Sequence, residues 1–228
     1  MKESLSKLLR RVAPRSLKAR LYREASAAIA RDMLSREAEM PRTDLKARHL
    51  AEARLLSDRQ ALLASLPSGG IVAEIGVAAG DFSADILRIA LPERLILIDA
   101  WHSNRYGDAL RKSVEARFAA ERESSQLEII RGLSIDACAR LKDDSLDWAY
   151  IDTDHSYETT RDELKILSKK VRLGGWICGH GYACGYWPHL RRYGVVEAVH
   201  EFCAKHDWQL GYLTMEQRVM PSFAIRRS

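Results

Sequence analysis

The sequence lacks the signatures of several large classes of protein. No apolar run approaches the ~18 residues that a membrane-spanning helix needs, so we expect no transmembrane segment. The four cysteines form no C-x-x-C pair, so neither a zinc site nor a disulfide framework is indicated, and reduced thiols in a cytoplasm are expected. A G-x-x-x-x-G-K-S/T loop is also missing, which excludes a nucleotide site of the Walker type.

The composition is that of a water-soluble globular protein. Hydrophobic residues make up 46% and charged residues 29% of the 228 residues. At a prior of about 150 residues per domain, this length favours one domain with an added segment. The net charge of +5 is unevenly distributed, because residues 1–23 contain eight Lys or Arg and one Glu and so carry +7. Subtracting +7 from +5 leaves −2 for the rest, so the basic character belongs to the N-terminus.

The first part of the sequence has helical patterning. Apolar residues recur at helical spacing over residues 5–12 with basic residues between them, and Pro14 interrupts this helix. A second helix is predicted from Ser16 to Glu39, and a third begins at an N-cap, Thr43. The third helix would carry Leu45 and a series of leucines that we expect in the core: Leu50, Leu55, Leu56, Leu62 and Leu63. We therefore predict a basic helical extension over residues 1–66.

The positive charge in residues 1–23 is compatible with three roles. The segment can cover the active site or form a homodimer contact, it can lie on an anionic membrane surface as a peripheral contact, or it can bind nucleic acid. The first role is favoured and nucleic acid is the least favoured, because the rest of the chain carries no basic excess. The protein is accordingly expected in the cytoplasm, with membrane association as the alternative.

Residues 67–228 alternate between short apolar runs and helical patterns. This alternation predicts an α/β fold, a Rossmann-like, doubly wound sheet of seven mostly parallel strands with a C-terminal antiparallel hairpin at its edge. The expected strands span residues 71–75, 95–98, 127–130, 146–151, 176–178, 208–214 and 221–226. The expected helices span residues 82–90, 110–122, 135–141, 159–170 and 195–206.

The first of these strands ends in a glycine-containing loop. Gly76 and Gly80 separate it from the next helix, and glycines at the carboxyl end of a parallel strand let backbone amides approach a ligand. Asp99 ends the following strand, 25 residues after Glu74, where a carboxylate can accept both ribose hydroxyls of an adenosine. The pairing fits NAD or S-adenosylmethionine. The absence of G-x-G-x-x-G and of Tyr-x-x-x-Lys disfavours a dehydrogenase.

Titratable residues follow the fourth and fifth strands. Asp152, Asp154 and His155 come after the fourth strand and His180 after the fifth, so we expect them to converge beside the cofactor and to include a base that works near neutral pH. Ordinary capping is the alternative interpretation. In that case Asp154 or Ser156 caps the following helix, His155 is a solvated loop residue and Asp152 only orients backbone amides.

Five short motifs follow one another along residues 67–228. They are Glu74–Gly80, Asp99 with Trp101, Gly132–Ser134, Ile151–Tyr157 and Gly174–His180. Together they resemble the successive motifs of class I S-adenosylmethionine-dependent methyltransferases, most closely the small-molecule O-methyltransferases similar to macrocin O-methyltransferase. The resemblance includes residues 221–225 and does not cover the N-terminal helices. It implies a methyltransferase domain over residues 67–228.

The resemblance also implies roles for individual residues. The cofactor S-adenosylmethionine would be bound by Glu74, Gly76, Gly80, Asp99, Trp101, Ser134 and Asp152. Asp154 matches the residue that serves as base in metal-dependent relatives, and the titratable group after the fourth and fifth strands adds His155 and His180 as catalytic candidates. In metal-dependent relatives the residue matching Asp152 binds Mg²⁺ together with an acidic pair after the fifth strand, which here reads His180-Gly181. The implied metal ligands are therefore Asp152 and His180 alone, and the loss of oxygen ligands disfavours Mg²⁺.

The function implied by the resemblance is methyl transfer to a hydroxyl group of a small molecule or saccharide. Two alternatives remain open at this point. The missing acidic residue at position 181 is compatible with a non-catalytic partner or regulatory protein on a methyltransferase fold. The basic N-terminus is compatible with an RNA methyltransferase, although no Asn-Pro-Pro-Tyr motif follows the fourth strand.

Overall fold

The computed structural model describes residues 14–186, 190–217 and 219–227. The chain divides into two compact units between Met40 and Pro41, whereas the sequence predicted the boundary between residues 66 and 67. The difference arises because residues 41–66 contribute a strand and a helix to the second unit. The helix predicted over residues 5–12 lies outside the described residues.

The described part of the first unit is one helix, α2 (Arg15–Glu39), which confirms the second predicted helix. It begins after Pro14 and ends just before Pro41, as expected because a proline disfavours helical geometry in the residue before it. None of its residues is buried, and ion pairs one turn apart, such as Arg20 with Glu24 at 2.8 Å, lie on its surface. Among the described helices, none has both the length and the apolar character that crossing a bilayer requires.

The second unit is built on a sheet of eight strands in the order β1-β9-β10-β6-β5-β2-β3-β4. All strands run parallel except β10, which is antiparallel to both neighbours, β6 and β9. The strands are β1 (Arg54–Leu56), β2 (Ile71–Ile75), β3 (Arg94–Asp99), β4 (Leu127–Arg131), β5 (Leu146–Ile151), β6 (Val171–Gly179), β9 (Trp208–Thr214) and β10 (Phe223–Arg227). A separate two-stranded sheet joins β7 (Gly185–Tyr186) to β8 (Arg191–Arg192).

The predicted fold class is confirmed, with two differences at the C-terminal side of the sheet. All seven expected strands are present, and β1 adds an eighth that pairs in parallel with β9. The antiparallel hairpin of β9 and β10 forms as predicted, but β10 lies inside the sheet and β1 occupies the edge. A three-residue strand with no alternating pattern gives too little signal to be recognised from the sequence.

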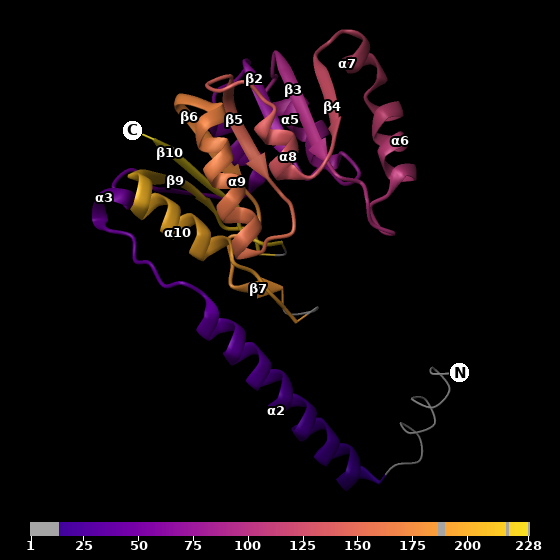
Figure 1. Ribbon diagram of the computed structural model, residues 1–228, viewed down its shortest axis with the longest axis vertical. Coiled ribbons are helices and arrows are strands. Elements are labelled where there is room, and N and C mark those ends of the chain that lie inside the picture. Colours follow the sequence, from indigo (N-terminus) through magenta and orange to yellow (C-terminus); the bar gives the residue numbers. More distant parts are fainter. Residues whose placement is uncertain (1–13, 187–189, 218, 228) are drawn as a thin grey trace. The chain divides into compact units, whose positions relative to one another are not determined.

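Helices cover both faces of this sheet. On one face, α8 (Ser134–Ala139), α9 (Tyr157–Lys170) and α10 (Val195–His206) lie side by side and bury residues such as Leu164 and Val199 against the strands (Figure 1). On the other face, a second cluster includes Leu62 of α4 (Arg59–Ser65), Ile86 of α5 (Asp81–Ile89) and Val114 of α6 (Asp108–Arg117), which α7 (Ala119–Glu123) follows. The unit therefore has three layers, as a doubly wound fold requires.

The single helix predicted from Thr43 onward is wrong. The structure has instead α3 (Ala47–Leu50), then β1, then α4. Asp58 starts α4 by accepting a 2.8 Å hydrogen bond from the Ala61 amide, which separates this helix from the preceding residues. Of the leucines expected in the core, Leu62 and Leu63 are buried, Leu56 is half-buried, and Leu50 and Leu55 are exposed.

Candidate active site

The loop after β2 is held close to the end of β5 by a glycine. Gly76 has φ +92°, and a Cβ atom there would lie 2.1 Å from the carbonyl oxygen of Asp152. A larger residue would therefore push the two strand ends apart. Gly80, with φ +77°, ends the loop and begins α5. Of the two glycines predicted to bind the cofactor, Gly76 thus brings the first loop beside the titratable residues that follow β5.

The carboxylate of Asp99 organises this same loop. One oxygen accepts hydrogen bonds from the amides of Val77 (2.9 Å) and Ala78 (3.0 Å), and the other accepts one from the amide of Trp101 (2.8 Å). The buried indole of Trp101 in turn donates to the carbonyl oxygen of Ala78 at 3.1 Å. A carboxylate has about four acceptor positions, so about one remains for a ribose hydroxyl rather than the two that we expected. Trp101, which was predicted to bind the cofactor, is therefore buried and stabilises the loop through this hydrogen bond.

Glu74 lies buried under the loop and accepts a hydrogen bond from the hydroxyl of Ser83 on α5. Burial raises the pKa of Glu74 to about 8, and the hydrogen bond from Ser83 only partly opposes this shift. A carboxyl group in this state can donate as well as accept a hydrogen bond near neutral pH. The loop thus offers a buried acid, a partly free carboxylate and close backbone approach, which fits a nucleoside cofactor.

Ser134, predicted to lie near adenine, begins α8 and makes its polar contact inside the protein. Its side chain hydrogen-bonds to Glu163 of α9, which also accepts a 3.0 Å hydrogen bond from the hydroxyl of Thr153. Burial raises the pKa of Glu163 to about 7, although both hydrogen bonds oppose the shift. The position of Ser134 at the end of β4 fits the prediction, and its contact with adenine stays a prediction.

Asp152, His155 and His180 form a cluster, called here the histidine–aspartate cluster. Oδ1 of Asp152 lies 3.3 Å from Nε2 of His155 and 3.5 Å from Nδ1 of His180. Burial alone would raise the pKa of Asp152, but the two imidazoles beside it hold that pKa well below its usual value. The structure thus brings together three of the predicted residues, at the ends of the neighbouring strands β5 and β6.

The ring of His155 occupies the space in front of position 181. His155 has φ +61° and stacks on Tyr193 with ring centroids 4.6 Å apart. A Cβ atom at Gly181 would lie 2.1 Å from Cδ2 of His155, so a side chain there would displace the ring. The missing acidic residue at 181 and the placement of His155 are therefore one structural feature, and His155 is not the solvated loop residue of the capping alternative.

Asp154 is not part of the cluster. Its exposed carboxylate accepts hydrogen bonds from the amide and the hydroxyl of Ser156, both at 2.9 Å, and from the hydroxyl of Thr159 at 3.1 Å. Ser156 is the N-cap of α9. The geometry therefore supports the capping interpretation for Asp154, and its predicted role as a base has no support from its position.

Arg59 is a site residue that the sequence analysis missed. It comes from α4, and its guanidinium lies 3.5 Å from Oδ2 of Asp152 and over the ring of Phe82 at 4.9 Å. Burial opposes its charge, but Tyr150 and Asp152 raise the pKa of Arg59. The sequence placed this arginine in the middle of a long helix, so nothing in its pattern pointed to the site.

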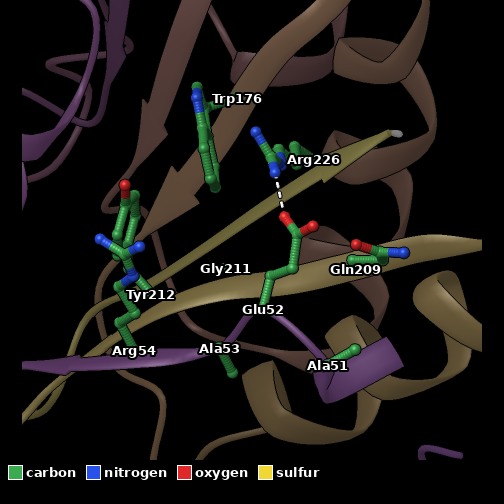
Figure 2. Close-up of a pocket in the computed structure, with 9 residues that line it drawn as sticks. All are labelled: Ala51, Glu52, Ala53, Arg54, Trp176, Gln209, Gly211, Tyr212 and Arg226. Atoms are coloured by element: carbon green, nitrogen blue, oxygen red, sulfur yellow. Dashed lines mark hydrogen bonds and ion pairs between the residues drawn. The ribbon is translucent and has the colours of Figure 1, made fainter. Parts of the chain in front are cut away.

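A cavity of about 550 Å³ lies elsewhere in the unit (Figure 2). Trp176 of β6 stacks on Tyr212 of β9 with ring centroids 4.9 Å apart, and the ion pair of Arg226 with Glu52 crosses the cavity wall. None of the predicted cofactor-binding or catalytic residues lines it. The candidate site is therefore identified by the polar residues at the carboxyl ends of the strands and not by the size of a cavity.

Comparisons with known proteins agree with this geometry. Residues 73–182 match a protein family described as a methyltransferase domain, and no curated protein matches the chain. Similar solved structures are the tRNA methyltransferase TrmK of Bacillus subtilis (14% identity, 76% of this chain, 67% of that chain, TM-score 0.54) and geranyl diphosphate C-methyltransferase of Streptomyces coelicolor (9%, 75%, 78%, 0.56). A Clostridium thermocellum protein assigned as an rRNA methylase is also similar (14%, 74%, 92%, 0.55). At these identities the structures establish the fold alone.

Residues 73–182 thus match a methyltransferase domain, and the second unit has the Rossmann-like fold of methyltransferases. The domain implies S-adenosylmethionine as cofactor, and the loop of Glu74, Gly76 and Asp99 fits it. The residues around Asp152 fit Mg²⁺, the ion of metal-dependent relatives, less well than the loop fits S-adenosylmethionine. Beside Asp152 the described residues offer two imidazole nitrogens, whereas Mg²⁺ prefers an octahedron of oxygen ligands.

Proposed function

We propose that this chain transfers a methyl group from S-adenosylmethionine to a hydroxyl group of a small molecule or saccharide, as in the O-methyltransferases similar to macrocin O-methyltransferase. The observation that carries the proposal is His180. Its Nε2 is buried and has no hydrogen-bond partner among the described residues, while its Nδ1 faces Asp152. An imidazole that directs one N–H toward a carboxylate presents the other nitrogen as a proton acceptor.

The mechanism follows from this arrangement. When bound, S-adenosylmethionine supplies a methyl group on a positively charged sulfur. The acceptor hydroxyl must lie in line with that methyl group and lose its proton as the new bond forms. His180 accepts this proton at Nε2, and Asp152 orients the ring and stabilises the imidazolium that results. Gly76 keeps this pair next to the cofactor loop because it allows the ends of β2 and β5 to touch.

The non-catalytic alternative loses its main argument. Position 181 lacks an acidic side chain, but the ring of His155 fills the same space and supplies a polar atom in its place. A site whose polar groups are rearranged rather than removed is what an active enzyme needs. The RNA alternative rests on two structurally similar proteins, the rRNA methylase and the tRNA methyltransferase named above, and on the basic residues 1–23.

Two measurements test the proposal. Calorimetric titration of S-adenosylmethionine into the full chain should show binding that Asp99→Asn weakens. Transfer of a labelled methyl group is then measured, with a chelator present, to hydroxyl-bearing small molecules and saccharides and, in parallel, to tRNA and rRNA transcripts. The proposal expects labelled ethers of small acceptors. Labelled RNA would favour the RNA alternative, and cofactor binding without turnover on any acceptor would favour the non-catalytic one.

The assignment of the base has its own test. His180→Gln should lower kcat by about 10²-fold or more, the usual contribution of a positioned base, and leave cofactor binding unchanged. Asp154→Asn, the matched carboxylate variant outside the cluster, should leave kcat within about twofold. The reverse pattern would move the base from His180 to Asp154.

A further inference from the structure

The histidine–aspartate cluster has the geometry of a site for one metal ion. One ligand atom from each of Asp152, His155 and His180 lies within 4.8 Å of the other two. Two donors that bind a single tetrahedral ion at about 2.1 Å are about 3.4 Å apart. The separations from Oδ1 of Asp152, 3.3 Å to Nε2 of His155 and 3.5 Å to Nδ1 of His180, are close to this value. Two of the three donor separations thus already suit one bound ion, and the third is within 4.8 Å.

Two imidazole nitrogens that face Asp152 have no hydrogen-bond partner within the described residues. Nε2 of His155 and Nδ1 of His180 are buried without a hydrogen bond of acceptable geometry. Buried polar atoms that lack a partner are rare and destabilising. A metal ion at the cluster would satisfy both nitrogens and Oδ1 of Asp152 at once. Oδ2 of Asp152 faces Arg59 instead, so the aspartate would bind through one oxygen.

The donor set selects the class of ion. Two neutral imidazoles and one carboxylate suit Zn²⁺, Co²⁺ and Ni²⁺, whereas Mg²⁺ prefers oxygen ligands throughout. The packing of His155 against Gly181 builds this selectivity into the fold, because the ring stands where a side chain at 181 would lie. Stacking on Tyr193 holds the ring in that place.

We propose that Asp152, His155 and His180 bind one divalent transition-metal ion and prefer Zn²⁺ or Co²⁺ to Mg²⁺. The proposal goes beyond methyl transfer, and binding is measurable with neither cofactor nor acceptor present. The ion binds the lone pair of Nδ1 in neutral His180, so the single ring proton must lie on Nε2. A metal-loaded cluster therefore cannot use Nε2 of His180 as the proton acceptor. Metal and proton transfer thus compete for one side chain.

The test is metal binding to the full-length, chelator-treated protein. Zn²⁺ is titrated by calorimetry, and Co²⁺ is added to record the visible spectrum of the ligand field. A Cys184→Ser background removes the one exposed thiol among the described cysteines. We expect one ion per chain, a Co²⁺ spectrum without thiolate bands, and no comparable uptake of Mg²⁺. Preference for Mg²⁺, or no binding of Zn²⁺ and Co²⁺, would overturn the proposal.

Variants assign the ligands. His155→Ala and His180→Ala should each weaken Zn²⁺ binding by at least the roughly 10–100-fold that loss of a supporting residue costs. His206→Ala is the matched control, because this exposed imidazole on α10 lies outside the cluster and its loss should leave the affinity unchanged. Equal affinity in His155→Ala and the parent would contradict the proposal, as would a loss of equal size in His206→Ala.

Gly181 provides a variant that removes no ligand. Gly181→Ala should displace the His155 ring and weaken Zn²⁺ binding although all three donors remain. The double variant His155→Ala with Gly181→Asp opens the space and adds a carboxylate, so its preference should move toward Mg²⁺; aspartate also tolerates the φ of +78° at this position better than most residues. Retained Zn²⁺ affinity in Gly181→Ala would show that His155 is not a ligand. Circular dichroism verifies that each variant is folded.

Discussion

At the scale of single residues, the site consists of polar groups that the fold keeps in unusual states. Glu74 is buried with a raised pKa, Asp99 is committed mainly to backbone amides, and His155 takes the space of a side chain that is absent at 181. Each state depends on a contact with another segment: Ser83 of α5 for Glu74, the loop after β2 for Asp99, and Gly181 after β6 for His155. Substitutions at these residues therefore report on packing as well as on chemistry.

Glu74 predicts a pH dependence of stability. Its pKa is about 8 in the folded chain against an ordinary value of 4.5, so between these two pH values the folded state holds a proton that the unfolded chain has lost. The free energy of unfolding must then fall as pH rises from about 4.5 to 8. Glu74→Gln removes this contribution, and its stability relative to the parent should increase with pH. Urea unfolding at pH 5, 7 and 8.5 measures the difference.

Glu163 also makes the free energy of unfolding fall as pH rises, because its pKa is raised to about 7. The comparison of Glu74→Gln with the parent cancels this contribution, since Glu163 is present in both proteins. A difference in unfolding free energy that stays constant across the three pH values would show that Glu74 is ionised in the folded chain near neutral pH.

Gly76 predicts a large loss of stability on a small substitution. In Gly76→Ala the new Cβ would lie 2.1 Å from the carbonyl oxygen of Asp152, in addition to the strain of a φ of +92°. We expect a loss of at least about 2 kcal/mol, together with loss of cofactor binding. Gly174→Ala is the control, since Gly174 also has a positive φ, of +76°, but no atom within 4 Å of its Cβ position. Equal losses in urea unfolding for the two variants would refute the close approach of β2 and β5.

At the scale of elements, the sequence predicts a strand well where a short apolar run is bounded by turn residues. The runs over residues 71–75, 146–151 and 208–214 agree with β2, β5 and β9 at both ends. The prediction of one helix over residues 43–66 was wrong because their leucines recur at helical spacing, although a strand lies there between two short helices. Residues 54–56 form a strand because they pair with β9, and a local sequence pattern carries no information on that distant partner.

The candidate site was predictable to the same extent. Asp99, Asp152 and His180 follow apolar runs directly, and the carboxyl ends of parallel strands meet at one edge, so their convergence could be expected. Arg59 and the packing of His155 on Gly181 could not, because each depends on a contact between segments that the sequence does not join. The capping role of Asp154 was one of two interpretations, and only the hydrogen-bond partners distinguish them.

The hydrogen bonds of Asp154 at the start of α9 predict the effect of replacing it on stability and on cofactor binding. Its carboxylate holds Ser156, the N-cap, and the hydroxyl of Thr159. Asp154→Ala should lower stability by about 1 kcal/mol, the usual cost of losing such a cap, and should leave S-adenosylmethionine binding unchanged. Thermal unfolding and cofactor titration of the same sample measure both. Unchanged stability together with lost cofactor binding would contradict the capping role.

At the scale of the whole molecule, the division between Met40 and Pro41 predicts the effect of shortening the chain. Removing residues 1–40 takes away a helix with no buried residue, so Tm should stay within about 2 °C of the full chain. Removing residues 1–66 also takes away Leu62 and Leu63, and the loss of these two buried side chains should cost at least about 3 kcal/mol. Calorimetric unfolding compares the three proteins. Similar Tm values for the two shortened forms would support the boundary at residue 66.

The small strand β1 also bears on how the protein behaves at high concentration. Without it, the seven residues of β9 would form the border of the sheet and offer unpaired N–H and C=O groups to another molecule. β1 is three residues long and exposes Arg54, so it ends the sheet with a short, charged border that is a poor template for further strands. β1, which belongs to the second unit, therefore protects this edge of the sheet from pairing with another molecule.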